Sequence, residues 1–179
     1  MNKGICEQYP ISNVEYIQLD KEFGKLCKYA SWKLIKNNSK NNHTDDFEDI
    51  NQELLISMLK AGSYYKRQTY IEQCFQVVKN YKIDNFIMFV LRELEELWFN
   101  RTRHGAGKQK FGYWQETLLQ RIVKAVVPKK HRPDRNQFLK IDTKFKTYCK
   151  AICWNMQKAL GRNISKEKDI RASTVSISE

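Results

Sequence analysis

The sequence predicts an all-α protein, a helical bundle of about six helices with basic loops. Apolar residues recur every three or four positions along most of the chain, which is the spacing that gives a helix one apolar face. No stretch shows the strict apolar–polar alternation of a half-buried strand. The 179 residues include only 7 Gly and 3 Pro, too few for the many tight turns of a β-sandwich or β-barrel.

The N-terminal half is expected to form four helices. The first covers 14–36 and the second covers 45–61. Acidic residues open the second helix, where they suit the positive end of the helix dipole, and Gly62 is expected to end it. After a short connector, a third helix is predicted over 69–82, and a strongly apolar fourth helix follows over 84–100.

The C-terminal half is expected to form two more helices, over 113–126 and 142–161. A basic loop precedes each of them, and the second loop contains two prolines, which interrupt helical structure. Gly161 is expected to end the last helix. The polar residues 163–179 are then expected to form a mobile tail.

Positive charge is concentrated in the second half of the chain. The formal net charge is +12, from 32 Lys and Arg against 20 Asp and Glu. Residues 1–100 hold 13 of the basic and 14 of the acidic residues, which leaves 19 basic and 6 acidic residues for 101–179. Such asymmetry is typical of proteins that bind a polyanion, above all nucleic acid. A solubilising surface is the alternative explanation.

Several features indicate a cytoplasmic protein without a membrane partner. The first twenty residues lack the apolar segment of a secretory signal, and no run reaches the roughly 18 apolar residues of a membrane span. The 5 Cys are an odd number and widely scattered, as expected for reduced thiols.

Few residues suggest catalysis or metal binding. Cys149 and Cys153 are one helical turn apart and could supply two zinc ligands together with His131 or His104, but buried thiols on a helix face are the simpler explanation. The Gly-bearing loop 104–110 has Gln after its Lys, so it lacks the Ser or Thr of a P-loop. We therefore predict no enzyme activity, no metal and no cofactor.

The acidic helix carries a pattern that points to a family. It contains Asp49-Ile50-Asn51-Gln52-Glu53, followed by Ser57-Met58-Leu59-Lys60-Ala61. This resembles the core-binding helix in region 2 of bacterial RNA polymerase sigma factors, which has an Asp-Leu-x-Gln-Glu pattern and a Leu-x-Lys-Ala end. The helix at 14–36 fits the first helix of the same domain. The short, region-2-centred late sigma factors of T-even phages are similar.

Two segments resemble the DNA-melting helix of that family, which begins Phe-x-Thr-Tyr. Gln68-Thr69-Tyr70-Ile71 has the Thr-Tyr pair without the Phe. In the stretch 144–162, Phe145, Thr147 and Tyr148 fit, but the two tryptophans of the family fall on Ala151 and Ile152, and Trp154 comes two residues late. The final Val-Ser-Ile-Ser-Glu resembles the linker that often follows region 2.

The resemblance leaves two domain organisations open. In one, residues 83–141 are an insertion ahead of the true DNA-melting helix. In the other, a sigma region 2-like helical domain is complete at 1–82, and 83–162 is an added basic helical module. In both, 163–179 is the mobile polar tail.

The resemblance implies two binding sites. The acidic helix would bind the Arg-rich clamp coiled coil of RNA polymerase core through charge-assisted hydrogen bonds, using Asp49, Gln52, Glu53, Ser57 and Lys60. Helix capping and the helix dipole account for one or two of the five acids at 45–53, but not for all of them. Aromatic rings would stack on unpaired promoter bases while cations hold the DNA backbone. The predicted DNA-binding residues are Tyr70, Phe75, Lys79, Lys108, Lys110, Lys129, Lys130, Arg132, Lys146, Tyr148, Lys150, Trp154 and Arg162.

We therefore predict a sigma-like transcription initiation factor that recognises and melts promoter DNA in a bacterial or phage-infected cell. No segment resembles the helix-turn-helix with which sigma factors read the upstream promoter element, so a coactivator or a simple promoter is expected. One alternative is a DNA- or RNA-binding protein without a polymerase partner, such as a repressor or a recombination or packaging accessory. The other is a metal-dependent nuclease that uses His104 or Glu116.

Overall fold

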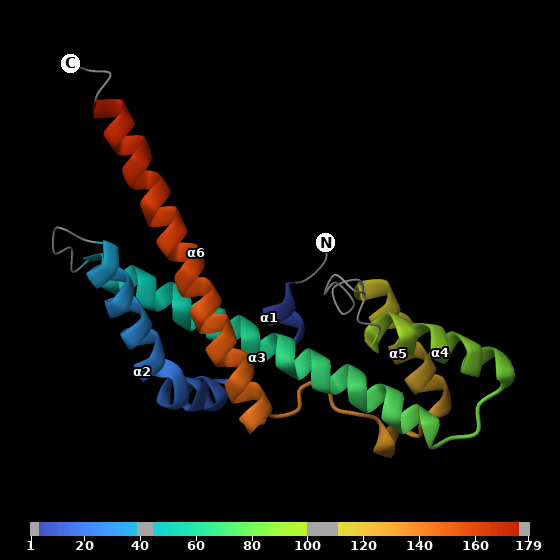
Figure 1. Ribbon diagram of the computed structural model, residues 1–179. Helices are drawn as coiled ribbons and strands as arrows, with labels where there is room; N and C mark the ends of the chain where they lie inside the picture. The colour runs from blue at the N-terminus through green and yellow to red at the C-terminus, as the bar shows by residue number, and fades with distance from the viewer. Residues whose placement is uncertain (1–3, 39–44, 100–110, 176–179) are drawn as a thin grey trace. The chain divides into compact units, whose positions relative to one another are not determined.

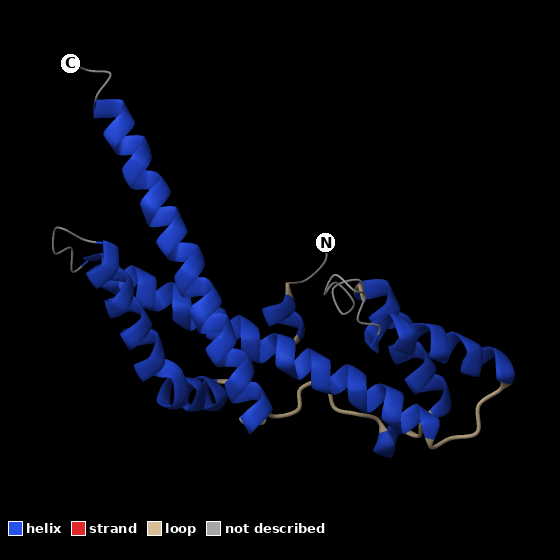
Figure 2. Ribbon diagram, viewed as in Figure 1, coloured by secondary structure: helices blue, strands red, loops and turns tan. Residues whose placement is uncertain are grey.

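The computed structural model of the protein describes residues 4–38, 45–99 and 111–175, and these residues form helices joined by loops (Figures 1 and 2). The described part of the chain contains no strand, so the predicted all-α class and the number of helices are confirmed. The elements are α1 (Ile5–Gln8), α2 (Asn13–Asn38), α3 (Asp45–Lys79), α4 (Asn85–Phe99), α5 (Tyr113–Val126), the short 3-10 helix η2 (Lys129–His131) and α6 (Thr143–Val175).

The chain divides into two compact units. Unit 1 consists of Met1–Tyr65 together with Phe138–Glu179, and unit 2 consists of Lys66–Gln137. The chain therefore leaves unit 1 within α3 and returns to it shortly before α6. The division predicted after residue 82 falls inside unit 2. The order of the elements in the sequence does not reveal the boundaries of the two units, because they depend on the packing of α6 against α2, which is distant in the chain.

The three segments predicted between residues 45 and 82 form one helix, α3 (Asp45–Lys79). Gly62 lies inside this helix, so the predicted end there is wrong. A Cβ atom at Gly62 would lie 3.0 Å from Ile11 Cδ1 and 3.2 Å from Leu139 Cδ2. Glycine at this position therefore permits close packing of neighbouring segments and does not end the helix.

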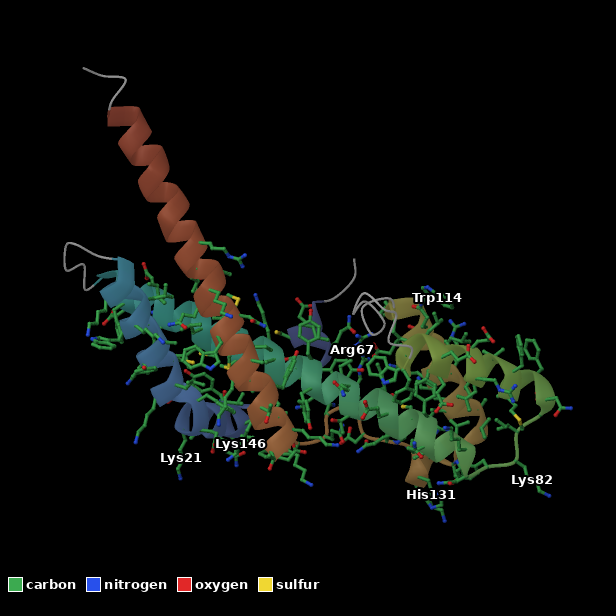
Figure 3. All side chains as sticks on the ribbon, viewed as in Figure 1. Lys21, Arg67, Lys82, Trp114, His131 and Lys146 are labelled. Carbon is green, nitrogen blue, oxygen red and sulfur yellow. The ribbon has the colours of Figure 1, made fainter. Side chains whose placement is uncertain are left out.

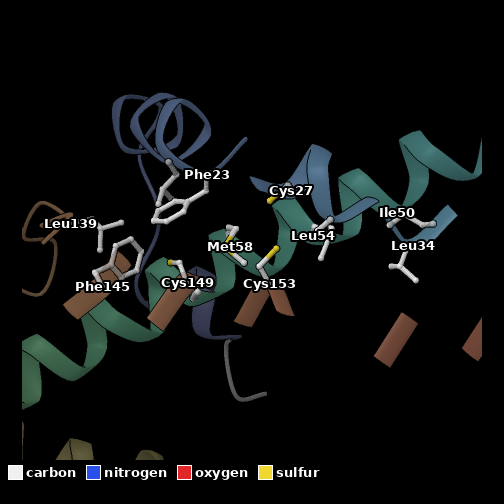
Figure 4. Close-up of a cluster of buried hydrophobic side chains, with 13 residues drawn as sticks. Phe23, Cys27, Leu34, Ile50, Leu54, Met58, Leu139, Phe145, Cys149 and Cys153 are labelled. Atoms are coloured by element: carbon white, nitrogen blue, oxygen red, sulfur yellow. The ribbon is translucent and has the colours of Figure 1, made fainter. Parts of the chain in front are cut away.

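The core of unit 1 is built from one face of each of its long helices (Figure 4). Phe145 of α6 is completely buried, and its ring makes an edge contact with Phe23 of α2 at 6.0 Å and a tilted contact with Tyr65 of α3 at 4.9 Å between centroids. The core side chains are Leu19, Phe23, Cys27, Ala30, Leu34, Ile50, Leu54, Met58, Ala61, Leu139, Phe145, Cys149 and Cys153.

Side-chain caps fix where α2 and α6 begin. Glu15 accepts hydrogen bonds from the Ser12 backbone N–H and hydroxyl, while the Glu15 N–H donates to the Ser12 hydroxyl, which is a capping box. At the start of α6, Asp142 Oδ1 accepts from the Phe145 N–H at 2.8 Å and also from the Tyr65 hydroxyl. The hydrogen bond from the Phe145 N–H lowers the pKa of Asp142, because it stabilises the carboxylate.

The last helix is longer than predicted. The backbone of α6 continues through Gly161 to Val175, so the predicted end at Gly161 is wrong and most of the predicted tail 163–179 has a helical backbone. A glycine inside a helix costs only about 1 kcal/mol relative to alanine, which does not by itself end the helix.

Unit 2 contains the end of α3 together with α4 and α5. Its apolar core includes Leu91, Leu94 and Trp98 of α4 and Leu119 of α5. A buried carboxylate, Glu116, joins these elements by ion pairs. No helix in the described part of the chain is long and apolar enough to cross a membrane.

Candidate nucleic-acid interface

Three aromatic rings lie together on the surface of unit 1. Tyr29 and Trp32 of α2 are each 51% exposed, and their rings stack at 6.4 Å between centroids with an angle of 29°. Trp154 of α6 contacts the Tyr29 ring edge-on at 6.5 Å and 88°. The rings therefore form a continuous cluster that includes residues from two helices.

Lysine side chains surround these rings. The Lys33 ammonium lies 5.6 Å from the centre of the Trp154 ring, and the Lys36 ammonium lies 4.9 Å from the centre of the Trp32 ring. Such cation–π contacts hold a positive charge over an aromatic face. Lys150 of α6 is also exposed, whereas Lys146 is ion-paired with Glu22 of α2. We refer to Tyr29, Trp32, Lys33, Lys36, Lys150 and Trp154 as the α2–α6 face.

Helical spacing explains why these side chains gather. At about 100° per residue, positions 29, 32, 33 and 36 share one side of α2, and core residues such as Cys27 and Leu34 occupy another. Positions 150 and 154 are likewise one turn apart on α6. Exposed rings can stack on unpaired bases, and the ammonium groups can neutralise the phosphates between them. This arrangement is therefore suited to single-stranded nucleic acid.

The predictions from sequence included only the α6 part of this surface. The four α2 residues were missed, although Tyr29, Trp32, Lys33 and Lys36 place two aromatic and two basic residues at helical spacing. That spacing on one side of a predicted helix was the available signal. Its significance depends on Trp154, which lies far away in the sequence and is brought beside Tyr29 only by the fold.

The predicted DNA-binding residues of α6 are divided between two sides of the helix. Lys146 and Trp154 are directed toward α2, as their contacts with Glu22 and Tyr29 show. Tyr148 is 40% exposed on another side, which also carries the exposed Arg162. The sequence had indicated that Tyr148 and Trp154 lie on different sides, and the structure confirms this.

Tyr148 has an aromatic neighbour that the sequence did not suggest. Tyr64 of α3 is 50% exposed and lies near Tyr148. Partial burial raises the pKa of the Tyr148 hydroxyl, and Cys149 and Tyr64 add smaller contributions in the same direction. Tyr64 and Tyr148 thus form a second, smaller aromatic surface on unit 1.

The other Thr-Tyr segment is buried. Tyr70 is 7% exposed and Phe75 is fully buried in unit 2, so the prediction that these rings stack on bases is wrong. Burial raises the pKa of the Tyr70 hydroxyl and raises that of the neighbouring Cys74 thiol to about 12. Tyr70 and Phe75 therefore contribute to packing, because they lie on the apolar face of α3 in the core of unit 2.

The remaining predicted DNA-binding residues differ in their surroundings. Lys129 and Lys130 are exposed on η2. Lys79 is ion-paired with Glu95, and Arg132 donates hydrogen bonds to the carbonyl oxygens of Lys124 and Val127, so Arg132 stabilises its own loop. Lys108 and Lys110 lie outside the described residues.

The acidic pattern lies on the outward side of α3. Asp49, Gln52, Glu53 and Lys60 are all exposed, whereas the Ser57 hydroxyl donates to the carbonyl oxygen of Glu53. At about 100° per residue, the exposed positions lie on one side of the helix, and Leu54 and Met58 enter the core from another. Ile56, which sequence reasoning did not select, is 48% exposed in the middle of the acidic pattern. We refer to Asp49, Gln52, Glu53, Ile56 and Lys60 as the α3 face.

The buried thiols behave as structural side chains. The Cys27 thiol donates a hydrogen bond to Cys153, which together with burial raises the pKa of Cys27. Burial raises the pKa of Cys149 to about 12. Among the described residues, no three His, Cys, Asp or Glu side chains are arranged to hold a metal ion. Of the suggested zinc partners, His131 hydrogen-bonds Tyr81 in unit 2, and His104 lies outside the described residues.

Glu116, suggested as a nuclease residue, has a clear structural role. Its side chain is 3% exposed and pairs with Arg67 at 2.9 Å and with Arg135 at 3.3 Å. The Arg67 guanidinium also donates to the Phe111 carbonyl oxygen and lies over the Trp98 ring.

Comparisons of the chain with protein-family models, with curated proteins and with solved structures gave no match.

Proposed function

We propose that the protein is a sigma-like transcription initiation factor that binds RNA polymerase core and promoter DNA through two different faces of unit 1. The observation that carries this proposal is the presence of opposite chemistries on one helical unit. The α3 face offers carboxylates, while the α2–α6 face offers aromatic rings and ammonium groups. Exposed carboxylates at the positions of the sigma-like pattern favour a second, basic partner besides nucleic acid.

The α3 face suits a basic protein partner. Asp49, Gln52 and Glu53 are exposed and can accept charge-assisted hydrogen bonds from arginine. Ile56 adds an apolar contact between them, as is common at the centre of protein interfaces. These positions include those that match the core-binding pattern of sigma factors, and the proposed partner is accordingly the clamp coiled coil of RNA polymerase.

The α2–α6 face suits the unpaired strand of an opened promoter. Stacking on an aromatic side chain is worth about 1–3 kcal/mol per base, and the flanking lysines favour the backbone. We assign the DNA-contacting role to α6 rather than to the Thr-Tyr segment of α3, because Tyr148 and Trp154 are accessible while Tyr70 is buried.

The packing of α3 and α6 in one unit favours the organisation in which the sigma-like domain is interrupted by an insertion. The two helices that match the core-binding and DNA-melting patterns, α3 and α6, contribute to one core, and unit 2 begins within α3 and ends before α6. Unit 2 is then an insertion into the proposed region 2, and the proposed place of action is the cytoplasm of a bacterial or phage-infected cell.

Capture of bacterial core RNA polymerase by the tagged chain tests the proposal. The wild type is expected to bind, and Asp49→Lys/Glu53→Lys is expected to lose binding because it reverses two charges on the α3 face. Glu93→Lys/Glu96→Lys is the matched control, since it makes the same kind of change at two exposed positions of α4 in unit 2. No capture by the wild type, or equal capture by both variants, would contradict the proposed polymerase partner.

A second measurement separates the two faces. Trp32→Ala/Lys36→Ala is expected to keep polymerase binding and to weaken binding of a single-stranded oligonucleotide by roughly tenfold or more, because a stacking platform and a cation are lost. If oligonucleotide binding depends on these residues but polymerase is never captured, the alternative of a nucleic-acid-binding protein without a polymerase partner is favoured.

A further inference from the structure

We propose that unit 2 carries a separate binding pocket for a single nucleotide, in which two cations hold its phosphate and an aromatic and apolar wall holds its base. The pocket is formed by the end of α3, the start of α4 and the residues between them. None of its residues belongs to the α3 face or to the α2–α6 face. The proposal therefore goes beyond the proposed function and does not depend on it.

The pocket has the size and the mixed lining of a small-molecule site. Its volume is about 450 Å³, within the roughly 300–1,000 Å³ that ligand pockets span. Lys82 and Arg92 provide positive charge, Ile83, Met88 and Leu91 provide apolar surface, and Tyr81 adds an aromatic side chain to the lining.

The cationic side chains of the pocket differ in whether they are ion-paired. Lys79 also lines it, but its ammonium is ion-paired with Glu95, which neutralises it. Lys82 and Arg92 are exposed, and neither has an ion-pair partner within the described part of the chain. The lining therefore carries two available positive charges. A guanidinium and an ammonium that line one pocket suit a phosphate, to which arginine can donate two parallel hydrogen bonds.

The aromatic wall is held in place from outside the pocket. The Tyr81 hydroxyl forms a hydrogen bond with His131 Nδ1 at 2.5 Å, and the two rings lie 6.4 Å apart. Figure 3 shows His131 near the C-terminal end of α3 and Lys82 on the segment that leads from α3 to α4. The exposed Lys129 and Lys130 precede His131 on η2 and extend the positive surface beyond the pocket.

These features together indicate a nucleotide and not a simple anion. Two cations alone would suit any phosphate or carboxylate, but they would not require the neighbouring wall of Ile83, Met88 and Leu91. A base can pack against such a wall and against the Tyr81 ring, because every base has an apolar π-face. The ligand can be a free nucleotide or one unit of a single-stranded nucleic acid, which share this chemistry.

Methyl NMR of the full chain tests the pocket directly. Met88 lines the pocket, whereas Met58 is buried in the core of unit 1, so their ¹³C-labelled methyl groups serve as reporter and internal control. The probes are adenosine monophosphate and a short single-stranded oligodeoxyadenylate. We expect the Met88 signal to shift with at least one probe while Met58 stays unchanged.

Two matched variants identify the residues responsible. Lys82→Ala/Arg92→Ala removes both available cations and is expected to raise the dissociation constant measured at Met88 by about tenfold or more, since two charge-assisted hydrogen bonds are lost. Arg121→Ala/Lys124→Ala removes two exposed cations of α5 elsewhere in unit 2 and is expected to leave it unchanged.

The result also identifies the source of the ligand. A shift with the monophosphate supports a free nucleotide, and a shift with the oligonucleotide alone supports a unit within a strand. The proposal is overturned if neither probe shifts Met88, or if Lys82→Ala/Arg92→Ala leaves the shift intact. Polymerase capture through the α3 face is measured separately, so failure of the pocket and failure of the proposed function remain distinguishable.

Discussion

The buried carboxylate of Glu116 allows a quantitative test of how unit 2 is stabilised. Glu116→Gln keeps the size of the side chain but removes its charge, which leaves Arg67 without a counter-charge in a site where the Arg67 side chain is only 16% exposed. Removing one partner of a buried ion pair costs about 3–5 kcal/mol. Arg135 is 36% exposed, so water can replace the carboxylate as its partner. The Arg135–Glu116 ion pair therefore contributes at most about 1 kcal/mol to the free energy of unfolding.

We therefore expect Glu116→Gln to lower the free energy of unfolding of unit 2 by about 3–5 kcal/mol. Native-state hydrogen exchange can assign this loss, because the amides of Leu119 and Ile122 report on the core of α5. Since about 1.4 kcal/mol corresponds to a tenfold change, their exchange is expected to accelerate by roughly a hundredfold to a few thousandfold. The amides of α2 in unit 1 are expected to be little affected.

Two comparisons make the test decisive. Glu93→Gln neutralises an exposed glutamate of α4 and is expected to change stability by no more than about 0.5 kcal/mol. In a double-mutant cycle with Arg67→Met, the coupling to Glu116 is expected to exceed about 1 kcal/mol. A loss below about 1 kcal/mol for Glu116→Gln, or no coupling to Arg67, would refute the view that the pair is buried and mutually compensating.

Two further predictions concern unit 1. Phe145→Ala empties a fully buried site and is expected to lower the free energy of unfolding, measured in urea, by about 3–5 kcal/mol. Lys150→Ala on the exposed side of α6 is expected to lower it by no more than about 0.5 kcal/mol. Similar losses for both variants would contradict the described core. Asp142→Ala removes the cap of α6 and is expected to lower the melting temperature. Because the pKa of Asp142 lies below its usual value of 3.8, the difference from wild type should be complete above that pH and should shrink as the pH falls through the lowered pKa; a difference that persists in strong acid would contradict the charged cap.

Local patterns predicted the elements of this protein well, and the exceptions share a cause. The helical class follows from apolar spacing, which each segment displays by itself. Glycine is common just after the last residue of a helix, which is why the sequence predicts helix ends at Gly62 and Gly161. At Gly62 the deciding fact is the approach of Ile11 and Leu139, which no local pattern contains.

The candidate interface shows the same limit. The acidic pattern Asp49, Gln52 and Glu53 was visible in the sequence, because exposed positions on one helix can be worked out from their spacing. Tyr70 and Tyr148 occur in similar Thr-Tyr contexts, and no local pattern separates them. Their accessibility depends on which elements pack over them, and it is Tyr70 that is buried.

By itself, then, the sequence determined the helical class, the acidic side of α3 and the excess of positive charge, since each is a property of neighbouring residues. Only the tertiary structure decided that α6 packs with α2 and α3, that Trp32 and Trp154 belong to one surface, and that unit 2 interrupts unit 1. The physical reason is that burial depends on contacts between residues that are distant in the sequence, such as Phe23 and Phe145. Helical periodicity permits many pairings of helix faces, and close packing of the side chains selects one of them.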